Sequence, residues 1–215
     1  DVTAVELDKK LPAVLSETLK GYDNVRIVPG DILKVNIPEI MGDKPFKVAA
    51  NLPYYITTPI LMALLERHLP ITHMVTMVQK EVALRMVAKP GGKDYGALSV
   101  AVQYYTEPEY VTTVSRNCFM PRPNVDSAVI CLHGRKTPAV AVKDEAFLFR
   151  LIRASFAQRR KTLVNGIGNA ADLPITKQQA TEALQSLGWS ENLRGETLTL
   201  EQFAHLADVL SEMYM

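Results

Sequence analysis

Cysteine is scarce in this sequence, which holds only Cys118 and Cys131 among its 215 residues. Two cysteines are too few for a disulfide scaffold, and they lack the paired spacing of a zinc site. The four histidines are scattered along the chain, so we expect no metal ion. Cysteine use of this kind favours a reducing compartment, and we therefore expect a cytoplasmic protein.

Long apolar runs and an excess of one charge are also missing. No stretch reaches the roughly 20 apolar residues of a transmembrane helix, so we expect no membrane partner. The start, Asp1–Glu6, lacks the basic residues and the apolar core of a signal peptide. The formal net charge is only +1, so no global basic field indicates a nucleic-acid partner. Any binding of RNA must depend on local patches.

Strand-like and helix-like segments alternate through the first part of the chain, which predicts a doubly wound α/β sheet. Apolar strand patterns are expected at 2–7, 25–28, 46–50 and 73–79. Helices are expected between and after them, at 9–21, 59–69, 81–88 and 96–105. Two further strands, at 110–114 and 125–132, follow without a helix between them. They predict an antiparallel pair at the edge of the sheet.

From Glu145 onward the apolar pattern is purely helical, with Phe147 and Leu151 on one face. A chain of this size can bury one full core and a small second domain. We therefore predict a Rossmann-like domain over residues 1–138 and a second, helical domain over residues 144–215.

The segment Asn51-Leu52-Pro53-Tyr54-Tyr55 follows a predicted strand, where α/β sheets place their ligands. The C6 amine of adenine is a weak nucleophile, so an enzyme that methylates it must orient both amine hydrogens with acceptors. The Asn51 side chain and the Leu52 carbonyl would serve, because Pro53 biases Leu52 toward an extended conformation. Tyr54 offers a flat face to an unstacked base. The alternative is that Asn51 caps the next helix and the tyrosines fill the core.

This segment resembles the catalytic motif of methyltransferases that act on exocyclic amines such as N6 of adenine. Four further segments are similar to motifs of the small-subunit ribosomal RNA adenine-N6,N6-dimethyltransferases, the kasugamycin-sensitivity family. They begin at Val2, Val28, Phe119 and Phe156 and follow the order of the family. A single match would be weak, whereas the ordered set is a strong resemblance that covers essentially the whole chain.

The resemblance implies that Glu6 and Asp31 hold the methyl donor, S-adenosylmethionine. Glu6 would accept hydrogen bonds from the ribose hydroxyls. Asp31 would accept from the adenine amine of the cofactor, while the N–H of Ile32 meets the ring and Asn51 borders the cofactor. Alone, Glu6 could be a surface acid that starts a helix, and Gly30-Asp31 an ordinary turn. The position of Asp31, 25 residues after Glu6 and at the end of the next strand, favours the cofactor role.

Two more of these segments are expected to contact RNA. Phe119 opens a stiff loop with alternating prolines, and it would close over the face of the target base opposite Tyr54. Tyr55 would help to bind the same substrate. Otherwise Phe119 is a plug in the core. Cations near Phe156 form a patch for phosphates, or simply a solvated helix end: Arg150, Arg153, Arg159, Arg160 and Lys161.

One motif of the family is missing from this sequence. The family begins with a strand and a Gly-x-Gly-x-Gly loop that cradles the methionine end of the cofactor. The eleven glycines here are spread out, and Gly166-Ile167-Gly168 does not follow a strand. We therefore expect several tens of residues before Asp1 in the natural protein. We also expect these 215 residues to lack a central strand, to bind S-adenosylmethionine weakly and not to methylate.

The resemblance implies a monomeric enzyme of ribosome biogenesis whose helical domain, residues 144–215, recognises RNA. It would methylate N6 of two adjacent adenines near the 3′ end of small-subunit rRNA, within a ribosomal particle. The nearest alternative is the macrolide-resistance branch, which modifies large-subunit rRNA; the Tyr54-Tyr55 pair and the 159–163 segment favour the small-subunit branch. A second alternative is a non-catalytic RNA-binding or assembly factor with the same fold. The intact motif at Asn51 argues against that alternative, and the missing glycine loop argues for it.

Overall fold

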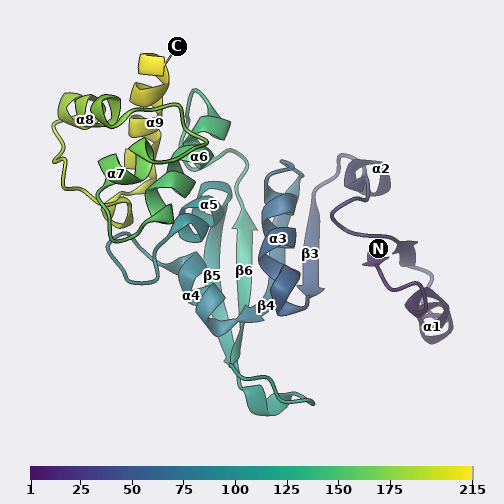
Figure 1. The fold of residues 1–215 in the computed structure, drawn as a ribbon. Coiled ribbons are helices and arrows are strands. Elements are labelled where there is room, and N and C mark those ends of the chain that lie inside the picture. Colours follow the sequence, from purple (N-terminus) through teal and green to yellow (C-terminus); the bar gives the residue numbers. More distant parts are fainter. Residues whose placement is uncertain (215) are drawn as a thin grey trace. The chain divides into compact units, whose positions relative to one another are not determined.

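The structure is a computed structural model that describes residues 1–214. The chain divides into two compact units, drawn together in Figure 1. The first unit comprises Asp1–Phe46 and Tyr55–Pro70, and the second comprises Lys47–Tyr54 and Ile71–Met215. Within residues 1–214, no helix is long and apolar enough to cross a membrane.

The first unit contains a strand–helix–strand crossover. Strand β1 (Val2–Glu6) and strand β2 (Val25–Pro29) pair in parallel, and helix α1 (Leu11–Thr18) connects them. The register places Glu6 opposite Pro29, so the carboxyl ends of the two strands lie side by side. The short helix α2 (Ile37–Met41), which the sequence pattern did not predict, follows β2.

The second unit is built on a four-stranded sheet with the order β3-β4-β6-β5. Its strands are β3 (Phe46–Asn51), β4 (Ile71–Gln79), β5 (Thr106–Val114) and β6 (Ser127–Gly134). The last two pair antiparallel with β5 at the edge, which confirms the prediction.

In the second unit, side chains of one helix donate hydrogen bonds to the end of the helix that precedes it. The last turn of a helix leaves carbonyls without donors from a following turn, and at the end of helix α4 (Lys80–Val87) the Arg85 carbonyl accepts from the backbone only a long bond from the Ala88 N–H, at 3.4 Å. Helix α5 (Ala97–Tyr105) supplies donors for them. The Ser99 hydroxyl donates to the Arg85 carbonyl, and Gln103 Nε2 donates to the carbonyls of Met86 at 3.0 Å and Ala88 at 2.9 Å. These bonds fix the end of α4 to α5.

The predicted helical segment after Glu145 is confirmed. It contains α6 (Glu145–Ala157), α7 (Leu163–Gly168), α8 (Lys177–Ser186) and α9 (Leu200–Tyr214), which gather at one end of the second unit (Figure 1). Side chains of Asp144, Thr162 and Thr176 cap the starts of α6, α7 and α8, as short polar residues do at helix starts. The boundary between residues 138 and 144 remains a prediction.

Helix α6 is fixed to α5 by a partly buried polar and aromatic cluster. The hydroxyls of Tyr104 and Tyr105 donate to the two carboxylate oxygens of Glu145, at 3.0 and 2.6 Å. Both tyrosine rings also pack on Phe149, with centroids 5.2 and 5.6 Å away. Burial and the hydrogen bond to Glu145 raise the pKa of Tyr104, so its hydroxyl stays a donor at neutral pH.

Helix α3 (Tyr54–Leu65) starts earlier than the predicted residue 59, so Pro59 lies inside it. Proline cannot donate to the Tyr55 carbonyl four residues before it, which usually argues for a helix start. Tyr55 is 84% exposed, so solvent is available at this point of the helix. The apolar remainder of α3, including Leu61 and Leu64, is buried, and this burial stabilises the helix in spite of the proline.

Candidate active site

The Asn51–Tyr55 segment connects the end of β3 to the start of α3. Asn51 is the last residue of β3 and is exposed, and Tyr54 is the half-buried first residue of α3. Tyr55 is 84% exposed, so it does not fill the core, and that alternative is wrong for this residue. A polar side chain therefore ends the strand and an aromatic ring follows it closely, as the motif predicts.

The structure ties this segment to the Pro-rich loop. The hydroxyl groups of Tyr54 and Ser127 form a short hydrogen bond. Ser127 is fully buried and is the first residue of β6, where it pairs with Gln79 of β4 and Val114 of β5. The Tyr54 hydroxyl is thereby anchored to the end of the central strand β6. Sequence reasoning assigned no role to Ser127, although this residue is the last of the family-like segment that begins at Phe119.

The loop between β5 and β6 is braced at its base. The backbone N–H of Arg116 donates to Asp126 Oδ1 at 3.0 Å, and its guanidinium donates to the Asn124 carbonyl at 3.1 Å. Phe119 is half-buried, so it is not part of the buried core, whereas its neighbour Met120 is 98% exposed. The braced loop presents apolar side chains outside the core. That Phe119 covers the target base remains a proposal.

The two predicted cofactor acids come together within the first unit. Glu6 ends β1, and Asp31 lies two residues beyond the end of β2. The Gly30 N–H donates to the Glu6 carbonyl at 2.8 Å and joins the two strand ends. Glu6 Oε1 accepts from the Asp8 N–H at 2.8 Å, and Asp31 Oδ1 accepts from the Leu33 N–H at 3.0 Å.

An arginine that the sequence pattern did not indicate supports the Asp31 turn. The Arg67 guanidinium donates to the carbonyls of Ile32 at 3.4 Å and Val35 at 3.5 Å, and also to that of Leu33. Two carboxylates on adjacent, braced strand ends fit the hydroxyls of a ribose and the amine of an adenine. These residues could therefore hold the nucleoside part of S-adenosylmethionine.

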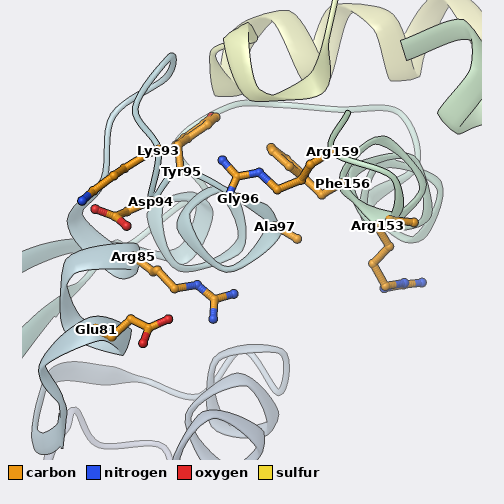
Figure 2. Close-up of a pocket in the computed structure, with 11 residues that line it drawn as sticks. Glu81, Arg85, Lys93, Asp94, Tyr95, Gly96, Ala97, Arg153, Phe156 and Arg159 are labelled. Atoms are coloured by element: carbon orange, nitrogen blue, oxygen red, sulfur yellow. The ribbon is translucent and has the colours of Figure 1, made fainter. Parts of the chain in front are cut away.

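The cations of the segment near Phe156 lie in different places in the structure. Arg153 and Arg159 line a cavity of about 460 Å³ in the second unit, together with Arg85 (Figure 2). Arg160 and Lys161 are exposed in the turn after α6 and do not line it. Arg150 lies elsewhere on α6, with its guanidinium 5.5 Å from the centre of the Phe147 ring. Sequence reasoning missed Arg85, since it lies far from the other cations along the chain.

The fold is that of an α/β methyltransferase, as two solved structures show. A dimethyladenosine transferase from Plasmodium falciparum has a TM-score of 0.79 at 25% identity, covering 96% of this chain and 80% of its own. The 23S rRNA methyltransferase ErmE has a TM-score of 0.67 at 26% identity, covering 98% of this chain and 82% of its own. Both are similar along nearly the whole of this chain.

The chain belongs to the ribosomal RNA adenine dimethylase family, whose sequence model matches residues 1–212. The ribosomal RNA small subunit methyltransferase A of Lachnoclostridium phytofermentans is 57% identical over 217 residues. The match covers 99% of this chain and 75% of the relative. The protein of the same name from Geobacillus thermodenitrificans is 51% identical, with 99% and 75% coverage. The resemblance of the five motifs is thereby confirmed at the level of the family.

Proposed function

We propose that this protein transfers methyl groups from S-adenosylmethionine to N6 of two adjacent adenines near the 3′ end of small-subunit rRNA. The observation that carries the proposal is the Asn51–Tyr55 segment at the end of β3, tied through Ser127 to the Phe119 loop. The names of the relatives support the small-subunit substrate. The higher identity to them than to the 23S rRNA methyltransferase supports the same choice.

In the proposed mechanism the protein orients the adenine amine and needs no metal. S-adenosylmethionine, when bound, supplies an activated methyl group on a sulfonium. The Asn51 side-chain oxygen and the Leu52 carbonyl would accept the two N6 hydrogens and so orient the nitrogen lone pair. Tyr54 stacks on one face of the base and Phe119 covers the other. Proximity and fixed dipoles then supply most of the rate enhancement.

Glu6, Asp31 and the Ile32 N–H hold the ribose and adenine of the cofactor in this proposal. The methionine end needs the Gly-rich loop, which the 215 residues do not contain. We therefore expect residues 1–215 to bind S-adenosylmethionine weakly. We expect an extended form, in which the Gly-rich segment of a relative precedes Asp1, to bind it well. Calorimetric titration of both forms tests this, and equal affinities would show a complete site within residues 1–215.

We propose that the monomeric protein binds rRNA through local cations. Arg153, Arg159, Arg160 and Lys161 are exposed on α6 and in the turn that follows it. Cations that neutralise phosphates release counterions from the nucleic acid, which makes the affinity depend strongly on salt. A chain with a net charge of only +1 needs such a local patch for RNA.

The test incubates the extended form with labelled S-adenosylmethionine and unmethylated small or large ribosomal subunits. We expect label only in small subunits, recovered as N6,N6-dimethyladenosine on digestion and mass spectrometry. Label confined to large subunits would favour the macrolide-resistance type of activity. Tight binding of small subunits without transfer, in a form that binds the cofactor, would favour a non-catalytic assembly factor.

A further inference from the structure

The turn that follows β2 in the first unit leaves one acceptor and one donor without partners. The Asp31 carbonyl accepts from the N–H groups of Lys34 at 2.8 Å and Val35 at 2.9 Å, which closes one helix-like turn. Asp31 Oδ1 accepts from the Leu33 N–H at 3.0 Å, so the carboxylate is held at the start of the turn. Among residues 1–214, no group donates to Asp31 Oδ2 and none accepts from the Ile32 N–H. Adjacent residues thus keep an acceptor and a donor for a ligand.

Arg67 supplies the hydrogen bonds that the end of this turn lacks. A single turn is unstable by itself, because it fixes several backbone dihedrals for one or two hydrogen bonds. No backbone N–H of residues 1–214 donates to the carbonyls of Ile32, Leu33 and Val35. The Arg67 guanidinium donates to all three, at 3.4 Å to Ile32, at 3.5 Å to Val35, and also to Leu33. One side chain therefore caps the whole turn.

The backbone of Arg67 is itself fixed by the end of α3. The Glu66 N–H donates to the Met62 carbonyl at 2.9 Å, and the His68 N–H donates to the Leu65 carbonyl at 3.2 Å. The Leu65 side chain is buried, so this end of the helix is anchored in the first unit. The end of a helix also favours a cation. Arg67 thus reaches from an anchored helix to a turn that lies 34 residues earlier along the chain.

The other side of the turn is fixed by the strand ends. The Gly30 N–H donates to the Glu6 carbonyl at 2.8 Å. A Cβ atom at Gly30 would lie 2.8 Å from Cγ1 of Val35, so the end of the turn packs closely on its start. Arg67, in contrast, is exposed, and its removal opens no buried cavity. Loss of this side chain should therefore loosen the turn without unfolding the first unit.

We propose that Arg67 is a positioning residue that gives the cofactor site its preference for adenine. This inference rests on the proposed function, in which Asp31 and Ile32 meet the base of S-adenosylmethionine. The adenine amine donates to Asp31 Oδ2, and a ring nitrogen accepts from the Ile32 N–H. Both bonds require one conformation of the turn. Arg67 stabilises that conformation and does not itself contact the base.

The test compares two ligands that differ only in the edge of the base. Hypoxanthine carries an oxygen in place of the adenine amine and an N–H in place of the ring acceptor, so it reverses both hydrogen bonds. S-adenosylhomocysteine and S-inosylhomocysteine are titrated by calorimetry against the extended form. The wild type should prefer the adenosyl ligand by at least about a hundredfold, because the wrong base leaves both protein groups unpaired.

Four variants separate positioning from a general effect on the fold. R67A should weaken binding of the adenosyl ligand about tenfold and that of the inosyl ligand less than about twofold. R67K keeps the charge without the fork of donors, so its preference should lie between those of the wild type and R67A. In a D31A background, R67A should reduce the preference less than it does alone, because both residues serve the same contact. The matched control is R26A, which removes an exposed arginine of β2 in the same unit and should leave the preference unchanged.

Two results of the titrations would overturn the proposal. Equal losses for both ligands in R67A would show a general effect on the site and no positioning of the base-reading groups. A preference in R67A like that of R26A would show that the turn does not depend on Arg67. Thermal melting shows whether each variant is folded. If R67A does not fold, the milder R67K decides, and a preference equal to that of the wild type overturns the proposal.

A measurement without ligand separates this inference from the proposed function. Hydrogen exchange of the ligand-free extended form is followed at the amides of Leu33, Lys34 and Val35, which are bonded within the turn. They should exchange about tenfold faster in R67A than in the wild type or R26A. Unchanged exchange would overturn the role of Arg67 whether or not the cofactor binds. A wild type that binds both ligands equally would count against the proposed cofactor site itself, whereas a preserved preference in R67A overturns only the role of Arg67.

Discussion

The hydrogen bond between Tyr54 and Ser127 predicts that the ring and the hydroxyl of Tyr54 make separate, measurable contributions to the rate of methyl transfer. Tyr54→Phe keeps the ring face but removes the bond to a fully buried hydroxyl. A bond of this kind is worth about 0.5–1.5 kcal/mol, so a loosened ring should slow transfer up to about tenfold. Tyr54→Ala also loses stacking worth roughly 1–3 kcal/mol per base, so it should be slower still by about tenfold or more.

A double-mutant cycle combines Tyr54→Phe with Ser127→Ala. The rate of each variant is measured by single-turnover methyl transfer in the extended form. The Ser127→Ala rate should equal that of Tyr54→Phe, and the double variant should be no slower than either, because both changes break one bond. Tyr22→Phe is the matched control, since Tyr22 is an exposed tyrosine outside the site. Full additivity would refute a positioning role for Ser127. Equal losses in Tyr54→Phe and Tyr54→Ala would refute the stacking role of the ring.

Three other predictions concern stability, thiol reactivity and RNA affinity. Glu145→Ala should lower the free energy of unfolding by about 2–4 kcal/mol, because two buried hydroxyls of α5 lose a charged acceptor; urea denaturation measures it. Burial raises the pKa of Cys131, so iodoacetamide should modify the exposed Cys118 first near pH 8, and a faster Cys131 would contradict this. Removing Arg160 and Lys161 together should lower the slope of log affinity for the particle against log salt by roughly 0.9 per lost contact, while the transfer rate at saturating substrate should fall less.

The sequence predicted those parts of the fold that depend on local patterns. Period-two and period-3.6 apolar patterns found the strands and the helices after Glu145, and the adjacent strands β5 and β6 pair at the edge as expected. The errors arose where tertiary burial outweighs a local signal. Pro59 indicated a helix start, yet the buried face of α3 stabilises a helix that begins at Tyr54.

The candidate site was predictable only where one segment carries its chemistry. Asn51 and Glu6 each end a strand and Asp31 lies just beyond one, a pattern that is visible in the sequence. Ser127 and Arg85 contact or adjoin residues that are distant along the chain, so no spacing rule finds them. Their positions become visible when the sheet brings Ser127 to Tyr54 and when α4 and α6 meet at one cavity.

The residue that most directly tests the proposed chemistry is Asn51. It supplies an acceptor for the adenine amine and no positive charge, so Asn51→Ala should lose transfer and keep its affinity for small subunits. The decisive measurement is therefore the single-turnover rate of Asn51→Ala in the extended form, at particle concentrations that saturate binding. We predict a rate lower by at least about a hundredfold, as for the loss of one preorganised group at a reacting centre, with an unchanged Kd. Transfer at a rate near that of the wild type would contradict the account.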